Sequence, residues 1–371
     1  MADRSIRRRE FLAGVTIAGG GALAASQFPS PAIAQNKRNL TMVMGWPHNF
    51  PGLASNAYNW AKYVEELSDG EITVKVHAAG ELVGAFEIWD ATGSGAADCY
   101  HGNPAWLASK WQGANFFCVI PFGLTALEHC GWLYHGGGLE MQQEFWRKRF
   151  NVVPFPAGQT GQQWGGWFNR EITDMDSFRG ITVRATGITA EVLRRAGASA
   201  AVVAPHEVFQ ALQSGVIDAA EIVGPWLDMG NGIHQHGKYY YTPGWQEPNS
   251  ACEVGINADL YDSLSPKHQK IMERAAQATN AVNLGEWPYY NIKFLRELKE
   301  KHNVDIRIFP DDVLTVLATE SVKLTEELGN ADEDSKRVYE SWKPYRDMAL
   351  DYSVHADLPS MQARKLALEI L

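Results

Sequence analysis

The chain has 371 residues, of which 45% are hydrophobic and 20% are charged, and its formal net charge is -10. This acidic surplus argues against nucleic acid and anionic membrane surfaces as partners, because both carry negative charge. The length exceeds what one ordinary hydrophobic core covers, so we expect two lobes.

The first 34 residues have the pattern of an export signal. The segment SIRRREFL places two arginines just before an apolar, glycine-rich stretch that is too short for a convincing membrane span. The small residues Ala32-Ile33-Ala34 precede Gln35, which predicts twin-arginine export to the periplasm and cleavage near Ala34. Removing this segment, with its four arginines and two acidic residues, takes the formal charge from -10 to -12.

Strand and helix patterns alternate along the chain, which is typical of an α/β fold. The first set comprises strands at 40–46 and 72–78, helices at 51–68, 85–92 and 126–149, and a short segment at 98–103. The second set comprises strands at 151–156, 164–169, 181–185, 200–203, 216–224, 239–245 and 253–257, with helices at 190–196 and 207–214. The last two strands are expected to lead back to the first lobe.

The region after residue 265 is predicted to be helical. From 266 to 302 the pattern is interrupted only near Gly285 and Pro288, which predicts one long, kinked helix, although two ordinary helices fit equally well. Further helices are predicted at 312–328, 332–352 and 360–371. The expected domains are lobe I (36–158 plus about 251–310), lobe II (159–250) and a C-terminal helical region (311–371) that packs across the lobes or on a partner subunit.

A carboxylate interrupts an apolar run in VIDAAEIVGPW. This residue is Glu221, and a buried carboxylate is costly unless a positive charge or a metal compensates it. The plain alternative is a half-exposed carboxylate without a special role. Three other stretches also place a polar residue among aromatic or glycine neighbours: GQQWGGWF with Gln163, ITVRATG with Arg184 and YTPGWQEP with Glu247.

These four residues, if they converge, define a site for a small organic acid and a cation. Arg184 offers a two-pronged donor that matches a carboxylate. With the acid bound, Glu221 and Glu247 would leave the site with two excess negative charges, so a cation is the natural compensation. An amide oxygen from Gln163, the two carboxylates and a backbone carbonyl are hard donors, which favour Na⁺ or Ca²⁺ over zinc.

Other candidate sites carry weaker signals. His234 and His236 leave a metal-capturing protein open as an alternative, although they face the same side only on a strand. The four cysteines lack CxxC spacing, so buried free thiols are expected and no disulfide can be assigned. They are Cys99, Cys118, Cys130 and Cys252. The common hydrolase, zinc-protease and nucleotide-binding motifs are not found in a convincing context, which leaves an exported enzyme acting on a small organic acid as another alternative.

Over nearly the whole mature chain, the sequence resembles the periplasmic solute-binding subunits of TRAP transporters, in particular the branch that binds 2-oxo and 2-hydroxy acids. The stretches that carry the resemblance are IPFGLTA, YHGGG, GGWF, Val183-Arg184, Ala220-Glu221 with Val223-Gly224-Pro225, and YYYTPGW followed by Glu247. The resemblance implies a non-catalytic, two-lobed, type II-like periplasmic binding protein with a long helix that spans both lobes. It would deliver its ligand to membrane permease subunits.

The resemblance also implies the site residues. Arg184 would grip the ligand carboxylate. The implied metal ligands are Gln163, Glu221, Glu247 and the main chain at Ile222. The full expected substrate-binding set is Arg184, Gln163, Glu221, Ile222, Glu247, Trp226, Tyr100, His101 and Asn103.

Two positions depart from the family pattern, and one region bears on assembly. Ile222 stands where close relatives carry Trp, and Gln246 replaces an aromatic residue, so both change the expected pocket wall. Some relatives in this branch form homodimers by exchanging the C-terminal helical region, and the residues beyond about 310 are numerous enough for such an exchange.

Overall fold

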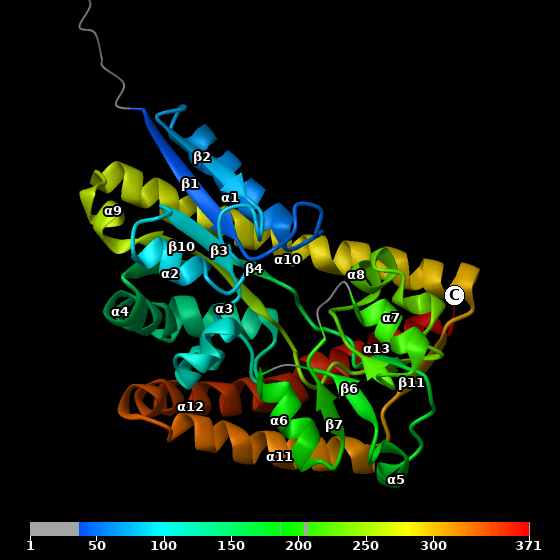
Figure 1. Ribbon diagram of the computed structural model, residues 1–371. Coiled ribbons are helices and arrows are strands. Elements are labelled where there is room, and N and C mark those ends of the chain that lie inside the picture. Colours follow the sequence, from blue (N-terminus) through cyan, green and yellow to red (C-terminus); the bar gives the residue numbers. More distant parts are fainter. Residues whose placement is uncertain (1–36, 186, 204–206, 371) are drawn as a thin grey trace, which may run out of the picture. The chain divides into compact units, whose positions relative to one another are not determined.

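The computed structural model describes residues 37–185, 187–203 and 207–370 (Figure 1). The predicted signal peptide, residues 1–34, lies outside the described residues. The described chain contains two mixed β-sheets, of five and six strands, with helices packed against them. This arrangement confirms the predicted α/β class with two lobes.

The first sheet has the strand order β2-β1-β3-β10-β4, in which β10 runs antiparallel to both of its neighbours. Every residue of β4 and β10 is buried, as expected for strands covered on both faces. Pro154 and Pro156 lie in β4, an edge strand, which is where a sheet tolerates proline. The strands are β1 (Arg38–Met44), β2 (Ile72–His77), β3 (Cys99–Gly102), β4 (Val152–Gln159) and β10 (Ala251–Asn257).

The second sheet has the strand order β11-β9-β5-β8-β6-β7, and only β5 runs antiparallel to its neighbours. Its strands are β5 (Gly166–Phe168), β6 (Thr182–Arg184), β7 (Ser199–Ala201), β8 (Ala219–Ala220), β9 (Tyr239–Thr242) and β11 (Asp305–Ile308). The predicted strand at 216–224 is therefore much shorter than expected. Pro225 starts helix α8 (Pro225–Gly230), and the residues before it turn out of the sheet.

Three segments connect the two sheets: residues 160–165, residues 243–250 and helix α10 (Pro266–His302). The first sheet is therefore discontinuous in sequence. Strand β11 pairs in parallel with β9 of the second sheet, whereas the sequence analysis expected residues up to about 310 in lobe I. The difference arises because α10 is long enough to carry the chain from one sheet to the other.

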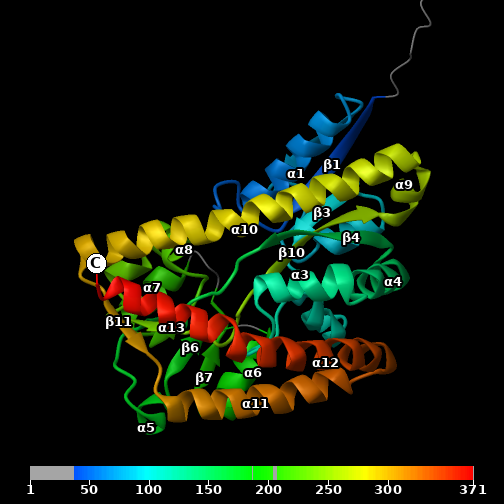
Figure 2. The ribbon, with the colours of Figure 1, turned by 180° about the vertical axis from the view of Figure 1, so that it is seen from behind.

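Helix α10 is one continuous helix of 37 residues, which confirms the single long helix over the alternative of two. It begins with the Ser265 side chain accepting from the His268 backbone N–H, with Pro266 in the first turn, and it ends at Asn303 in the left-handed region. Pro288 lies inside it. At 1.5 Å per residue the helix is roughly 55 Å long. It packs on α1 (Ala54–Leu67) and β4 at one end and on α8 at the other (Figure 2).

The opposite face of the first sheet is covered by α2 (Ile88–Gly93) and α4 (Gly138–Phe150). The sequence predicted one helix at 126–149, but the structure has α3 (Ala126–His135) and α4. The interruption falls at Gly136 and Gly137, and Gly137 adopts a φ of 81°, which glycine tolerates without strain. The remaining short elements are η1 (Pro104–Ser109), η2 (Gln112–Phe117), η4 (Ile233–Gln235) and α9 (Ala258–Ser263).

The C-terminal helices connect the two sheets on the side away from α10 (Figures 1 and 2). Helix α11 packs on the elements that flank the second sheet, and α12 packs on η2, α3 and α4 beside the first. Helix α13 contacts α12 and buries none of its side chains. The bounds are α5 (Met175–Phe178), α6 (Gly187–Arg195), α7 (Val208–Ser214), α11 (Asp311–Gly329), α12 (Glu333–His355) and α13 (Asp357–Leu368).

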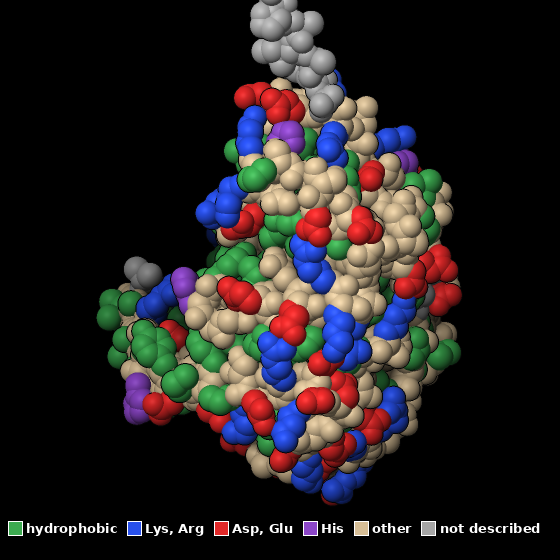
Figure 3. All heavy atoms as spheres, turned by 90° about the vertical axis from the view of Figure 1, so that its left-hand side faces the viewer, with side chains coloured by type: hydrophobic (Ala, Val, Ile, Leu, Met, Phe, Trp, Pro, Cys, Tyr) green, Lys and Arg blue, Asp and Glu red, His purple; other side chains and the backbone are tan. Residues whose placement is uncertain are grey.

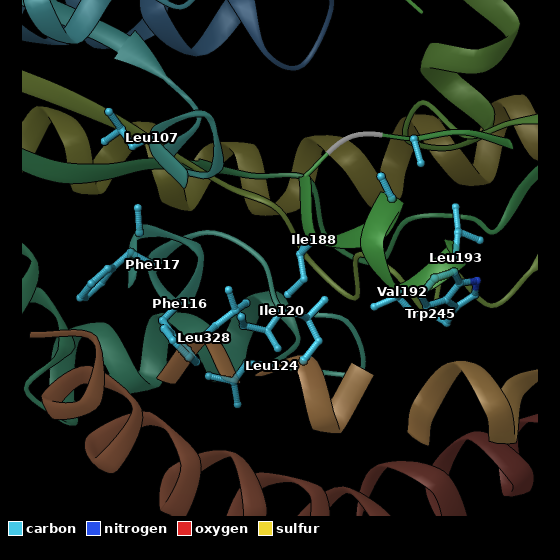
Figure 4. Packing of buried hydrophobic residues seen from close by; sticks show 14 of the residues in the cluster. Leu107, Phe116, Phe117, Ile120, Leu124, Ile188, Val192, Leu193, Trp245 and Leu328 are labelled. Carbon is cyan, nitrogen blue, oxygen red and sulfur yellow. The ribbon is translucent and has the colours of Figure 1, made fainter. Parts of the chain in front are cut away.

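A large apolar core extends from one lobe to the other. It contains Phe116 and Ile120 beside the first sheet, Ile188 of α6, Leu328 of α11 and Trp245 of a connecting segment (Figure 4). Because these residues come from both lobes and from the C-terminal helices, the lobes share a core on one side.

The surface is polar and mixed in charge. On the face drawn in Figure 3, basic and acidic side chains alternate without a large area of one sign. Many charged side chains of the described chain pair at the surface, as Arg147 does with Asp262. No helix in the described part of the chain is long and apolar enough to cross a membrane.

Glu253 on β10 is a fully enclosed carboxylate of the first lobe, with only 1% of its surface exposed. Its Oε1 accepts from Trp146 Nε1 at 2.8 Å, Trp89 Nε1 at 3.3 Å and the Tyr100 hydroxyl, and its Oε2 accepts from Gln142 Nε2 at 2.6 Å. Burial raises the pKa of Glu253 to about 7, although the hydrogen bonds lower it in part.

We expect Glu253→Gln to flatten the dependence of stability on pH. The native pKa of about 7 lies above the ordinary value of 4.5, so the folded state binds the proton more tightly, and stability falls as pH rises through this window. The variant lacks this titration, and its stability relative to wild type should therefore rise between pH 5 and pH 8 by up to roughly 3 kcal/mol. Urea denaturation at both pH values measures the change.

Exposed Glu340 provides the matched control, because its carboxylate faces solvent and pairs with Lys336, which is exposed as well. Equal stability differences at pH 5 and pH 8 for Glu253→Gln would show that Glu253 titrates normally in the folded protein.

Candidate ligand and cation site

A cavity of about 160 Å³ lies where strands of both sheets end. Arg184 is the last residue of β6, Glu221 directly follows β8, and Asn103 directly follows β3. Gln163 and Glu247 lie on the two connecting segments. Ligands of open α/β sheets bind at the carboxyl ends of parallel strands, and these five residues line the cavity at such a place.

Six of the nine predicted substrate-binding residues are brought together in this cavity. They are Arg184, Gln163, Glu221, Ile222, Glu247 and Asn103. The set includes all four predicted metal ligands.

Two backbone carbonyls orient the Arg184 guanidinium. Its Nε donates to the Val203 carbonyl at 3.2 Å, and its Nη1 donates to the Glu221 carbonyl at 3.1 Å. Its Nη2 makes no hydrogen bond to any described residue. The side chain is therefore fixed in direction while it keeps donors for a ligand carboxylate.

Gln163 and Glu247 hold each other in place. Gln163 is 2% exposed, and its Nε2 donates to Glu247 Oε2 at 2.7 Å and to Thr160 Oγ1 at 3.1 Å. A backbone hydrogen bond from Gln163 N to the Glu247 carbonyl, at 3.2 Å, ties the two connecting segments together. Because both amide donors are used, the orientation of the Gln163 amide is defined and its Oε1 carries free lone pairs.

Three buried oxygens of cavity-lining residues have no hydrogen-bond partner in the described part of the chain: Gln163 Oε1, Glu221 Oε1 and Gln246 Oε1. A buried acceptor without a partner costs about 1–3 kcal/mol, so a cluster of three indicates that a ligand or an ion satisfies them. Oxygen donors of this kind suit a hard cation such as Na⁺ or Ca²⁺.

The electrostatics agree with this interpretation. Burial raises the pKa of Glu247 to about 7. Burial, and then the charge of Glu247, raise the pKa of Glu221 well above its usual range, and the positive charge of Arg184 offsets only part of that rise. Two carboxylates beside one guanidinium leave one negative charge without a positive partner. The residues present therefore fit a bound cation.

Asp228 of α8 anchors the loop that carries Glu221 and Ile222. It is 1% exposed, and its Oδ2 accepts from Trp167 Nε1 at 3.0 Å and from the Tyr240 hydroxyl at 2.8 Å. Its Oδ1 accepts from the Val223 backbone N–H at 3.3 Å. The loop is thereby tied to strands β5 and β9 of the second sheet.

Three predicted residues lie outside the cavity lining. The Tyr100 hydroxyl is used by Glu253. Trp226 stacks on Tyr290 of α10, with ring centroids 4.4 Å apart. Each of these side chains is therefore occupied by packing within the protein.

His101, the third of these residues, is fully buried beside the cavity wall. An indole nitrogen can only donate, so His101 Nδ1 accepts from Trp46 Nε1 at 2.9 Å, and Nε2 carries the proton that it donates to the Ala157 carbonyl at 3.2 Å. Burial lowers the pKa of His101 to about 4, which keeps the ring neutral. Its role is to orient Trp46.

An aromatic wall of the cavity was not predicted from the sequence. Trp46, Phe50 and Trp106 line it from the first lobe. The ring centroids of Trp46 and Trp106 are 4.7 Å apart, and those of Trp46 and Phe50 are 6.2 Å apart. Trp46 could have been found, because it lies two residues beyond the carboxyl end of β1, a parallel strand.

The alternative metal centre does not assemble. His234 faces His302, and His236 faces Phe209. All four cysteines are free thiols, and three of them are buried, while Cys130 is half-buried. Within residues 37–185, 187–203 and 207–370, no group of three or more His, Cys, Asp or Glu side chains is placed to hold a metal ion.

Comparison with known proteins identifies the family. Residues 43–331 match the model of the bacterial extracellular solute-binding proteins, family 7, and the chain belongs to this family. It is 32% identical over 345 residues to the monocarboxylate 2-oxoacid-binding periplasmic protein of Nostoc sp., covering 92% of this chain and 94% of that protein.

Two solved TRAP transporter solute-binding proteins are similar in structure. The one from Pseudoalteromonas atlantica has a TM-score of 0.82 and 33% identity, covers 88% of this chain and 99% of its own, and contains sodium and pyruvate. The one from Bordetella bronchiseptica has a TM-score of 0.84 and 28% identity, and covers 90% of this chain and 98% of its own. It is a mixed-occupancy dimer with calcium and picolinate in one site.

Proposed function

We propose that the protein captures a small 2-oxo or 2-hydroxy monocarboxylate together with Na⁺ or Ca²⁺ and delivers it to the membrane subunits of a TRAP transporter. The observation that carries the proposal is the convergence, in one cavity, of an oriented guanidinium, two half-buried carboxylates and unpartnered oxygens. The relatives support it, because they bind pyruvate with sodium and picolinate with calcium.

In this proposal Arg184 grips the carboxylate of the acid. Gln163 Oε1, the carboxylates of Glu221 and Glu247 and the main-chain carbonyl of Ile222 hold the cation. When bound, the cation supplies the missing positive charge and two coordination positions for the carboxylate oxygen and the 2-oxygen of the acid. Asn103 lines the cavity from the first lobe as part of the same proposed binding site. Its Nδ2 donates to Ser250 Oγ at 2.9 Å.

Closure of the lobes would strengthen the contact between Arg184 and the carboxylate of the acid. Arg184 and Glu221 belong to the second sheet, and the aromatic wall belongs to the first lobe. When the wall covers the acid and excludes water, the Arg184 contact operates in a lower dielectric. Release to the permease then requires reopening, which the two connecting segments permit.

The lobe boundaries belong to the same proposal. Lobe I comprises residues 36–158 and about 251–302, lobe II comprises residues 159–250 together with β11, and α11 and α12 of the C-terminal region (311–371) pack across both. The strand pairing supports this division, because β11 joins β9.

We expect thermal denaturation of the mature protein to reveal an acid that stabilises it only when a cation is present. At about 100 times its dissociation constant, a ligand adds about 2.7 kcal/mol of stability.

Arg184→Ala should weaken acid binding by roughly 2–5 kcal/mol, the scale for truncating a buried charge pair. Calorimetry with 2-oxo and 2-hydroxy acids, in Na⁺, in Ca²⁺ and after chelation, measures both effects.

Arg179→Ala is the matched control, because this exposed arginine pairs with exposed Asp176 and lies outside the cavity lining. Unchanged acid affinity in Arg184→Ala would remove the carboxylate assignment, and binding without any cation would remove the metal assignment. Conversion of the acid, followed by NMR, would identify an enzyme instead of a receptor.

We also propose a homodimer in which α13 packs on a partner subunit. Helix α13 buries no side chain, yet it exposes Leu358, Met361, Leu366 and Leu368, and the Bordetella relative is a dimer. Sedimentation analysis should give a dimer for the mature chain and a monomer after deletion of residues 357–371. A monomeric mature chain would contradict the proposal.

Export by the twin-arginine route is proposed from SIRRREFL and the small residues before Gln35. A periplasmic location agrees with the family. N-terminal sequencing of the exported protein should begin near Gln35, and replacement of both Arg8 and Arg9 by Lys should leave the protein in the cytoplasm. Continued export of that variant would point to another route.

A further inference from the structure

Gln246 contributes a buried acceptor that the cation does not account for. It is 2% exposed and lines the cavity. Its Nε2 donates to the Trp164 carbonyl at 2.9 Å, which fixes the orientation of the amide, because a carbonyl can only accept. Its Oε1 has no partner among the described residues.

The Gln246 oxygen lies outside the proposed set of cation ligands, which are Gln163, Glu221, Glu247 and the main chain at Ile222. Because the Gln246 nitrogen donates to the Trp164 carbonyl, the other branch of the amide, Oε1, is the atom left without a partner among the described residues. Of the three unpartnered oxygens, Gln163 Oε1 and Glu221 Oε1 are taken up by the proposed cation, and Gln246 Oε1 remains.

We propose that Gln246 Oε1 accepts a hydrogen bond from the hydroxyl of a bound 2-hydroxy acid, so that the site prefers a 2-hydroxy acid to its 2-oxo counterpart. This inference rests on the proposed function. Lactate and pyruvate share the carboxylate, the methyl group and a chelating oxygen at carbon 2, but only lactate carries a hydroxyl hydrogen there. Pyruvate would leave the Gln246 oxygen buried without a donor.

The preference has an expected size and an expected handedness. A buried hydrogen bond that forms with one ligand and stays unmade with the other corresponds to about a tenfold difference in affinity. Rotation about the bond between carbon 2 and the hydroxyl oxygen lets either enantiomer direct the hydroxyl hydrogen to Gln246, but the two place the methyl group on opposite sides of the fixed carboxylate and 2-oxygen. The preference is therefore expected for the enantiomer whose methyl group the cavity accommodates.

The test is isothermal titration calorimetry of the mature wild-type protein with L-lactate, D-lactate and pyruvate at saturating Ca²⁺, repeated in Na⁺. A second matched pair, 2-hydroxyisovalerate and 2-oxoisovalerate, covers acids with a larger side chain. The expected result is that one hydroxy enantiomer binds about tenfold more tightly than its oxo counterpart. Equal affinities in both pairs, or tighter binding of the oxo acids, would overturn the inference.

Gln246→Met removes the acceptor and nearly keeps the side-chain volume. It should weaken the preferred hydroxy acid about tenfold and leave the oxo acid unchanged, which brings the ratio close to one. The matched control is Gln163→Met, which makes the same exchange at a proposed cation ligand and should weaken both acids to the same extent. A hydroxy-to-oxo ratio that persists in Gln246→Met would assign the preference to another group and overturn the role of Gln246.

The failure of the inference and the failure of the proposed function give different results. If both kinds of acid bind with a cation but without discrimination, only the role of Gln246 is lost. If neither kind binds under any cation condition, the carboxylate receptor assignment is lost as well. If Gln246→Met does not fold, as judged by its melting transition without ligand, the wild-type ratios decide the question on their own.

Discussion

Two carboxylates and one guanidinium enclosed in a small cavity set the electrostatic condition on which the site depends. Loss of solvation raises the pKa of both Glu221 and Glu247, and the nearby charge of Glu247 raises the pKa of Glu221 further, because like charges repel at short range. Arg184 neutralises one of the two, and it does so while its guanidinium is held by the Glu221 carbonyl. A folded chain keeps such an arrangement only if a proton or a cation completes it. An acid that brings a further negative charge makes the cation more necessary, so acid and cation are expected to bind as a pair.

The scaffold holds these charges at points where the chain passes from one sheet to the other. Gln163 and Glu247 lie on separate connecting segments that are hydrogen-bonded to each other, and the loop with Glu221 is fastened through Asp228 to the second sheet. The same loop reaches α10, because the Trp226 backbone N–H donates to Asn291 Oδ1 at 3.1 Å. The residues proposed to hold the cation are therefore positioned by the same hydrogen bonds that join the connecting segments to each other and the loop to the second sheet.

The sequence predicted the parts of the structure that local pattern determines. The helical pattern of α10 and the residues at its ends could be predicted, as could most strands, because each depends on neighbours in the chain. The charge imbalance of Arg184, Glu221 and Glu247 was also readable, because it follows from residue type. The break between α3 and α4 was missed, although Gly136 and Gly137 mark it. The pairing of β11 was missed because it joins residues more than 60 positions apart.

The misplacement of three site residues shows where side-chain prediction fails. Tyr100 and His101 are adjacent to Asn103, and the sequence alone does not reveal that a buried Glu253 and the Trp46 indole use them. Trp226 follows the site loop directly, yet it turns toward α10. In each case the deciding partner comes from a distant segment. Backbone position relative to the carboxyl ends of the strands is predictable, but the direction of a side chain depends on the tertiary fold.

The enclosed carboxylates of this protein differ in a way that separates structure from function. Glu253 and Asp228 are each surrounded by indole, phenol or amide donors, and their hydrogen bonds fill both carboxylate oxygens. Glu221 is also enclosed, but its Oε1 has no such partner in the described chain. These hydrogen bonds offset part of the cost of burial, which still raises the pKa of both groups, and they occupy both carboxylate oxygens with donors from the protein. A carboxylate that is buried and left incomplete is destabilising in the free protein, and in the proposed function that cost is recovered when the cation and the acid bind. The distinction supports a scaffold role for Glu253 and Asp228 and the proposed role of Glu221 as a cation ligand.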